Sequence, residues 1–303
     1  MSDADVEAPK KPKKKKKPKL DAPAPIEVAP AARREPPKAA PDPPPEPEAP
    51  ENDKPMTFWE HLEELRTRII RSAIFFLIAC GFAWWQKENL LAFIAKPFCD
   101  AWVKEGVTGK CSLNFASPQA PFMSYAKLSA IVGLAGAAPI IFYQLWGFIA
   151  PGLYSREKRY IYPFVFASTL LFIGGAWFGF LAAFPLAFGY FLGMAGDHGT
   201  SSVLTIAPVV TMESYIDFVT QMLLGFGIIF EIPIVLSFLA LVGIVNHKML
   251  IKFARYYILV AFIAAAILTP PDVTSQLVMA VPACLLYGVS IGLVWLMQKK
   301  APA

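Results

Sequence analysis

Six apolar runs fill most of the sequence after residue 55. A helix that crosses the hydrocarbon core of a bilayer, which is about 30 Å thick, needs about 20 predominantly apolar residues. With 55% hydrophobic residues, the chain is also too apolar for an ordinary soluble domain of this length. The sequence therefore predicts an all-α polytopic membrane protein with six transmembrane helices. The predicted spans are residues 69–86, 125–148, 160–184, 215–242, 256–268 and 273–297.

The fifth run is shorter than the others. At 1.5 Å per residue, residues 256–268 give a helix of about 20 Å. The Pro270-Pro271 pair that follows forces a tight turn. Either the bilayer thins at this point or the last two helices form a re-entrant pair. Both arrangements place the C-terminus on the same side, so the sequence leaves the two open.

Residues 1–55 are rich in proline and lysine and contain no aromatic residue. This composition cannot bury a core, so we expect a disordered tail. Its lysine run at residues 10–19 is suited to contact anionic membrane lipid. The formal net charge is +5, but the cations lie in this tail and in short loops, which argues against nucleic acid binding. We expect a tail at 1–55, a membrane domain at 56–298 and a short second tail at 299–303.

Positive charge is distributed unevenly between the two sides of the predicted bundle. If the N-terminus is cytoplasmic, then the tail, the segments 156–159 and 248–255, and Lys299-Lys300 all lie on the cytoplasmic side. The loop at 185–214, on the other side, has no lysine or arginine. Cytoplasmic loops of membrane proteins carry an excess of these residues. We therefore expect both termini in the cytoplasm.

The second apolar run ends in Trp146 and Phe148 and then opens into a charged turn. Aromatic rings followed by cations are typical of a helix that leaves the bilayer on its cytoplasmic side. Within the turn at 156–159, Glu157 is the single carboxylate among three cations. It either pairs locally in water, for under about 1 kcal/mol, or binds a cation from outside the chain. Its spacing leaves both possibilities open.

A short amphipathic segment precedes the first span. Thr57 and Glu60 have the spacing of a capping box, and an apolar face follows that ends at Ile69. We expect a short amphipathic helix lying on the membrane and leading into the first span. Glu60, Glu63 and Glu64 crowd the opposite face, which favours an external cation, although Glu64 and Arg68 also have the spacing of a helical ion pair. His61 lacks the second histidine of a zinc-protease helix, and we predict no metal site.

Of the residues in the predicted spans, Glu231 has the highest free-energy cost of insertion into the bilayer. It lies within the fourth predicted span, where a charged carboxylate costs about 3 kcal/mol. We expect it to be neutral or turned toward a polar groove, with a purely structural hydrogen bond as the alternative. Pro233 follows it and predicts a kink in the helix.

The segment between the last two spans holds further candidates. Asp272 is placed to cap the last helix on the periplasmic side. Thr269 and Gln276 are polar residues in apolar surroundings that could bond a polar residue of a single-span partner. Cys99 and Cys111 share one loop and could form a disulfide if that loop faces an oxidising compartment. The sequence does not decide whether they do.

The end of the second predicted span and the loop after it carry a resemblance to a known family. The residues concerned are, in order, Ala138-Pro139, Tyr143-Gln144, Trp146, 148–151, Leu153-Tyr154 and Glu157. This pattern resembles the second helix and following loop of TatC, the receptor subunit of the twin-arginine protein translocase. The resemblance covers residues 57 to about 297. It implies a glove-shaped bundle in the bacterial inner membrane that binds twin-arginine signal peptides and exports folded proteins using the protonmotive force.

The resemblance also implies roles for particular residues. Glu64 and Arg66 match functional positions of the family's amino-terminal helix, and Glu64 and Glu157 would receive the two guanidinium groups of the signal peptide. An arginine can bond a carboxylate through two parallel hydrogen bonds, whereas a lysine cannot. Phe148 would pack against the peptide, with a role as an interfacial anchor as the alternative. Glu231 would be a polar site within the bundle. The implied partners are TatA-type and TatB-type single-span subunits in an oligomeric complex, and neither a cofactor nor catalysis is implied.

Two other classes of function are alternatives to this one. A proton-coupled small-solute transporter would use Glu231 as a relay, but it predicts further buried ionisable groups or inverted repeats, and the sequence presents neither. An intramembrane aspartyl protease needs two carboxylates that meet at depth. Asp272 is predicted at a turn and Glu231 near the middle of a span, so their spacing argues against it.

Overall fold

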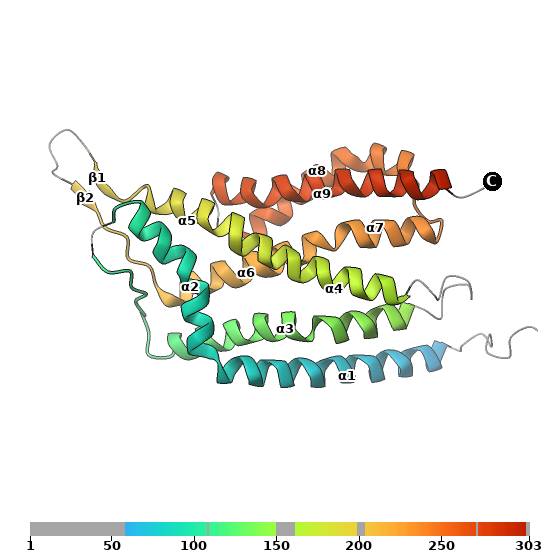
Figure 1. Ribbon diagram of the computed structural model, residues 1–303, viewed down its shortest axis with the longest axis horizontal. Helices are drawn as coiled ribbons and strands as arrows, with labels where there is room; N and C mark the ends of the chain where they lie inside the picture. Colours follow the sequence, from blue (N-terminus) through green and yellow to red (C-terminus); the bar gives the residue numbers. More distant parts are fainter. Residues whose placement is uncertain (1–57, 108, 150–160, 199–203, 271, 301–303) are drawn as a thin grey trace, which may run out of the picture. The chain divides into compact units, whose positions relative to one another are not determined.

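A computed structural model describes residues 58–107, 109–149, 161–198, 204–270 and 272–300 (Figure 1). The predicted tail at 1–55, Thr57 of the proposed capping box and the turn that carries Glu157 lie outside these residues. The chain divides into residues 1–55 and residues 56–303, and the second unit contains all the described elements.

Helices make up nearly all of the described structure. In chain order the elements are α1 (Phe58–Trp85), α2 (Lys87–Lys104), α3 (Ala120–Ile149), α4 (Ile161–Phe178), the π-helical η3 (Gly179–Ala183), α5 (Phe184–Leu192), β1 (Gly196–His198), β2 (Leu204–Ile206), α6 (Met212–Phe230), α7 (Ile232–Leu241), α8 (His247–Leu268) and α9 (Val273–Lys300). The two short strands pair antiparallel, with Asp197 opposite Thr205.

Six helical stretches in the described part of the chain are long and apolar enough to cross a membrane. They are Phe58–Trp85, Ala120–Ile149, Ile161–Leu192, Met212–Leu241, His247–Leu268 and Val273–Gln298. This confirms the predicted all-α membrane fold and the number of spans. α2 is not among the six, and it crosses the ends of α3 and α5 at the same end of the bundle as the hairpin (Figure 1).

The first span begins earlier than predicted. α1 is one helix of 28 residues, so the predicted amphipathic helix and the span into which it leads form a single helix. Residues 58–85 contain no proline and only one glycine, and nothing in this segment interrupts the backbone hydrogen bonds. The amphipathic segment is therefore the first part of a continuous helix.

The fifth span is longer than predicted. α8 has 22 residues, which is about 33 Å, so the expectation of a span too short for the bilayer is wrong. Asn246 caps the helix by accepting a hydrogen bond from the Met249 amide at 2.8 Å. Lys248, Lys252 and Arg255 interrupt the apolar run but not the helix, because cations at one end of a span can reach the bilayer surface.

Two other spans contain irregular helix. The third continues from α4 through η3 into α5, eight residues beyond the predicted end. The fourth is interrupted at Glu231, between α6 and α7, and Pro233 lies in the first turn of α7. Proline has no amide hydrogen to continue the helix, and this interruption lies where the sequence predicted a kink.

Close packing between α1 and α3 depends on Gly133. A Cβ atom at this position would lie 2.6 Å from Cys80 Sγ and 2.8 Å from the Cys80 backbone nitrogen. Any larger residue would therefore push the two helices apart. This contact joins the carboxyl-terminal half of α1 to the amino-terminal half of α3.

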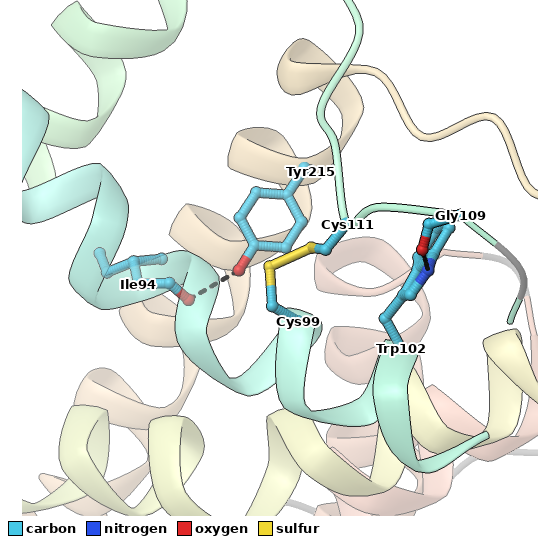
Figure 2. The surroundings of a disulfide bond; sticks show 6 residues. All are labelled: Ile94, Cys99, Trp102, Gly109, Cys111 and Tyr215. Carbon is cyan, nitrogen blue, oxygen red and sulfur yellow. Dashed lines mark hydrogen bonds between the residues drawn. A yellow bond between two sulfur atoms is a disulfide. The ribbon is translucent and has the colours of Figure 1, made fainter. Parts of the chain in front are cut away.

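The end of the bundle that carries the hairpin is fixed by α2. Tyr215 at the start of α6 donates a hydrogen bond to the Ile94 carbonyl at 2.7 Å, and Cys99 of α2 forms a disulfide with Cys111 in the following loop (Figure 2). The Trp102 indole donates to the Gly109 carbonyl at 3.3 Å. These contacts hold α2 and its loop against the core, where Phe98, Phe184, Phe188 and Tyr215 are buried.

Candidate functional site

The first part of the candidate site is an ion pair on α1. Arg68 Nη2 and Nε lie 2.6 Å and 2.9 Å from Glu64 Oε1, and Arg68 Nη1 donates to Gln144 Oε1 of α3 at 3.3 Å. The side chains of Glu64 and Arg68 are 19% and 22% exposed. The helical ion pair that the sequence left open is therefore formed, and α3 extends it with a third residue.

Glu64 still has one oxygen that is not used in this arrangement. Its Oε2 is buried and has no hydrogen-bond partner among the described residues. His61 Nδ1 lies 3.8 Å from this oxygen. The imidazole of His61 stacks on the ring of Phe148, with centroids 4.3 Å apart and an angle of 16° between the planes. The structure thus brings Glu64 and Phe148, two of the predicted site residues, into one cluster.

Gly147 makes room for this cluster. A Cβ atom at this position would lie 2.5 Å from Arg68 Nη1 and 3.2 Å from Arg68 Cζ. The guanidinium therefore rests on the backbone of α3 where no side chain projects. Sequence reasoning missed Gly147, Arg68 as a bridge between helices, and Gln144. The only signal for them was a glycine three residues from a glutamine inside an apolar helix.

An apolar cavity of about 380 Å³ lies beside the ion pair, between α1 and α3. Its lining residues are Leu65, Arg68, Ile69, Ser72, Ala73 and Phe76 from α1, and Ile141, Gln144, Leu145 and Phe148 from α3. A second, polar hollow on α1 is lined by Glu60, Glu63, Glu64, Thr67, Arg68 and Arg71. Arg68 lines both, so the ion pair stands where a charged surface meets an apolar one.

Arg66, the remaining site residue predicted on this helix, does not join the cluster. It is exposed, because residues two apart on an α-helix point about 200° away from each other. Glu157 lies outside the described residues, so the predicted pair of carboxylates is represented here by Glu64 alone.

Glu231 belongs to a second polar group inside the bundle. The Trp146 indole donates to Ser168 Oγ at 3.1 Å, and Ser168 lies beside the Glu231 side chain. Ser168 is fully buried, and Glu231 Oε1 is buried without a partner among the described residues. Glu231 therefore belongs to a polar group that includes Ser168, a neighbour that the sequence did not reveal.

Trp146 is not an aromatic anchor at the membrane surface. Its side chain is only 5% exposed and packs against Phe164 of α4 and Phe238 of α7, with ring centroids 5.0 Å and 4.9 Å away. The Trp146 ring therefore faces the protein interior, not the lipid headgroups as its place near the end of an apolar run suggests. An aromatic residue near the end of an apolar helix can equally face the protein interior, and the sequence pattern does not separate these cases.

The residues between α8 and α9 make contacts within the chain. Asp272 Oδ1 accepts a hydrogen bond from the Ser275 amide at 2.7 Å, which is the predicted cap of α9. Thr269 is buried and donates to the Ala265 carbonyl at 2.8 Å, and Gln276 Nε2 donates to the Phe262 carbonyl at 3.0 Å. Of the two residues predicted to contact a partner, only Gln276 is partly exposed in this structure.

Comparisons with known proteins agree on one family. A family model described as "Sec-independent protein translocase protein (TatC)" matches residues 60–282. A relative of that name from Koribacter versatilis is 41% identical over 248 residues, which cover 82% of this chain and 88% of the relative. One from Aquifex aeolicus is 38% identical over 245 residues, which cover 81% of this chain and 97% of the relative.

Solved structures agree with the sequence comparisons. A crystal structure of the twin-arginine translocase receptor TatC superposes with a TM-score of 0.68 at 39% identity and covers 79% of this chain and 100% of that one. A second, of TatC in the detergent DDM, also has a TM-score of 0.68 and 39% identity, and it covers 77% of this chain and 99% of that one. The chain described here therefore belongs to the TatC family of Sec-independent protein translocase proteins.

Proposed function

We propose that this chain is the signal-peptide receptor of a twin-arginine translocase in a bacterial inner membrane. It binds the paired arginines of a signal peptide at its cytoplasmic face and, with TatA-type and TatB-type subunits, exports folded proteins at the expense of the protonmotive force. Both termini lie in the cytoplasm. The description of a solved relative as a twin-arginine translocase receptor supports this proposal.

The unused oxygen of Glu64 carries the proposal. Arg68 engages only Oε1, and the buried Oε2 has no hydrogen-bond partner among the described residues, so Oε2 is the acceptor we assign to the incoming guanidinium. Arg68 also contacts Gln144, so it can move toward this second acceptor if the ligand takes both oxygens of Glu64. A charge-assisted hydrogen bond in a partly buried site is about twice as strong as a neutral one.

The cavity beside Glu64 supports the same function. A twin-arginine signal carries a hydrophobic segment after its arginines, and an apolar cavity of about 380 Å³ begins at Arg68 and Phe148. A peptide with its arginines at Glu64 would place its apolar side chains in this cavity, where burial contributes about 25 cal/mol per Å². Phe148 lies at the junction and would contact the residue that follows the arginines.

The other predicted residues take secondary roles in this proposal. Glu157 provides the second carboxylate, and Arg66 acts on the exposed face of α1 away from the cluster. Gln276 contacts a single-span partner from the surface of the α8–α9 pair, with Thr269 and Asp272 fixing the geometry of that segment. Glu231 provides the polar site within the bundle.

Site-specific crosslinking tests the proposal. A photoreactive residue replaces Phe148, and the full chain in membrane vesicles is offered a signal peptide with either an Arg-Arg or a Lys-Lys pair. We expect crosslinks to the Arg-Arg peptide that fall about tenfold or more with Glu64→Gln or Glu157→Gln. Glu63→Gln is the matched control, since Glu63 is exposed one residue away and should leave the crosslink unchanged.

Two outcomes would contradict the proposal. Equal crosslinking of the Arg-Arg and Lys-Lys peptides would show that the site does not distinguish the guanidinium group of arginine from the ammonium group of lysine. An equal loss with Glu63→Gln and Glu64→Gln would show that only the general negative charge of this surface matters.

A further inference from the structure

α2 presents one charged stripe that neither the fold nor the signal site uses. Phe93, Lys96, Asp100 and Lys104 follow one another at spacings of three and four residues, so they share one face of the helix. This helix is not one of the spans. It crosses the ends of α3 and α5 near the hairpin (Figure 1), which is the level of the lipid headgroups if the spans cross a bilayer.

The charged part of this stripe lines a cavity of about 350 Å³ against η3 and α5. Lys96, Asp100, Lys104 and Glu105 are all exposed there, and Phe180, Leu181, Pro185 and Gly189 form the facing wall. Within the described residues these four charged side chains form no ion pair with one another or with other groups. The cavity therefore combines two free cations, two free carboxylates and an apolar wall.

An apolar cavity of about 220 Å³ adjoins the charged one. Phe180 lines both cavities, and the apolar one continues between α2, α3 and α4 with Phe93, Ala135, Ala176 and Trp177 among its lining residues. The ring of Phe93 stacks on Phe180 and Trp177 at centroid distances of 4.8 Å and 6.3 Å. Phe93 and Trp177 are about half exposed, so this aromatic wall is accessible from outside the bundle.

We propose that these two adjoining cavities bind one phospholipid whose headgroup carries a phosphate and a primary ammonium, as in phosphatidylethanolamine. The phosphate lies between Lys96 and Lys104, the ammonium donates to Asp100, and an acyl chain enters the apolar cavity past Phe93. This arrangement leaves the apolar chain at the level of the bundle and the headgroup at its end.

The charges of α2 select this class of lipid. Two lysines and two carboxylates make the cavity neutral, so an anionic headgroup would meet Asp100 and Glu105 without a compensating ammonium. A choline headgroup carries positive charge but has no N–H to donate.

Photocrosslinking with a labelled lipid tests this proposal. The full chain is reconstituted in phosphatidylcholine nanodiscs containing a small fraction of phosphatidylethanolamine with a photoreactive group on one acyl chain, and crosslinked peptides are mapped by mass spectrometry. We expect labels on the segments around Phe93 and Trp177. Unlabelled phosphatidylethanolamine should compete more strongly than phosphatidylcholine or phosphatidylglycerol.

Variants separate the headgroup from the acyl chain. A lysine near a membrane surface contributes about 1 kcal/mol to binding a phosphate, so Lys96→Gln and Lys104→Gln should each reduce labelling about fivefold. Asp100→Asn should remove the preference over phosphatidylcholine, and Ala176→Phe should block the label by filling the apolar cavity. The matched controls are Lys110→Gln and Glu88→Gln, which change exposed charges that line neither cavity. Each variant is first checked for unchanged helix content and a single species in size-exclusion chromatography.

Three outcomes would overturn the proposal. Equal competition by all three lipids, with labelling unaffected by the variants, would indicate only the general lipid shell of a membrane protein. Stronger competition by phosphatidylglycerol would contradict the assignment of Asp100 to an ammonium. Labels confined to other helices would contradict the position of the site.

Discussion

At the scale of single residues, Gly147 controls the position of the Arg68 side chain. We predict that Gly147→Ala displaces the guanidinium from Gln144, because the new Cβ atom would lie 2.5 Å from Arg68 Nη1. The free energy of unfolding should change by less than about 1 kcal/mol, since a flexible side chain can move and alanine favours helix. Affinity for a twin-arginine peptide, measured by fluorescence anisotropy, should fall several-fold. Gly136→Ala on the same helix is the control, as its Cβ atom would meet only Ala79 Cβ at 3.8 Å. Equal affinity for both variants would contradict a role of Arg68 in binding.

Ser168 is the residue that satisfies the buried Trp146 indole. We predict that Ser168→Ala lowers the free energy of unfolding by about 1–3 kcal/mol, because a buried donor is left without its acceptor. The measurement is the thermal unfolding midpoint in detergent. Ser129→Ala is the control: Ser129 is also buried, but its hydroxyl has no hydrogen-bond partner among the described residues. A similar loss in both variants would show that the effect comes from packing alone.

At the scale of elements, Gly133 sets the distance between α1 and α3. We predict that Gly133→Ala lowers stability, whereas Gly174→Ala raises it or leaves it level. Alanine is better than glycine in a helix by about 1 kcal/mol, and nothing lies within 4 Å of a Cβ atom at Gly174. At Gly133 the same atom would lie within 3 Å of the Cys80 backbone, so the helices must separate. Thermal unfolding midpoints should rise or stay level for Gly174→Ala and fall for Gly133→Ala. A rise in both would mean that α1 can move without cost.

The disulfide ties the loop after α2 to its helix. Cys99 and Cys111 are 12 residues apart, and closing a loop of this size stabilises a protein by about 3 kcal/mol in the chain-entropy model. We predict that the double variant Cys99→Ser, Cys111→Ser unfolds at a lower temperature than the wild type. Dithiothreitol should lower the midpoint of the wild type to the same value and leave the variant unchanged. A wild-type midpoint that is insensitive to the reductant would show that this bond does not stabilise α2.

At the scale of the whole molecule, six spans place the loop after α2 and the turn before α8 on opposite sides of a membrane. We predict that Ala116→Cys reacts with a membrane-impermeant maleimide in intact spheroplasts, because Ala116 is exposed in that loop. Lys248→Cys should react only after lysis. Both variants are made with Cys80→Ala and Cys284→Ala to remove the free thiols. The reverse pattern would overturn the proposed orientation, and labelling of both before lysis would overturn the number of spans between them.

The features that the sequence determined are those that depend on neighbouring residues. The number and order of the spans follow from the lengths of the apolar runs, the break after Phe230 from Pro233, and the cap of α9 from Asp272. Each rests on backbone hydrogen bonding or on transfer into lipid, and both are local or additive along the chain. α1 and α8 both begin earlier than the predicted spans. The reason is that charged residues end an apolar run without ending a helix.

Tertiary structure decided which polar groups meet. Arg68 and Gln144 are 76 residues apart, and Trp146 meets Ser168 across 22 residues, so no local spacing specifies either contact. Because α3 is apolar on all sides, its sequence does not reveal that Trp146 faces inward or that Gly147 faces α1. The sequence predicted Glu64 as a site residue, but its free oxygen and the cavity beside it depend on the packing of α1 against α3. That packing is set by contact between distant surfaces, which a pattern of neighbouring residues does not encode.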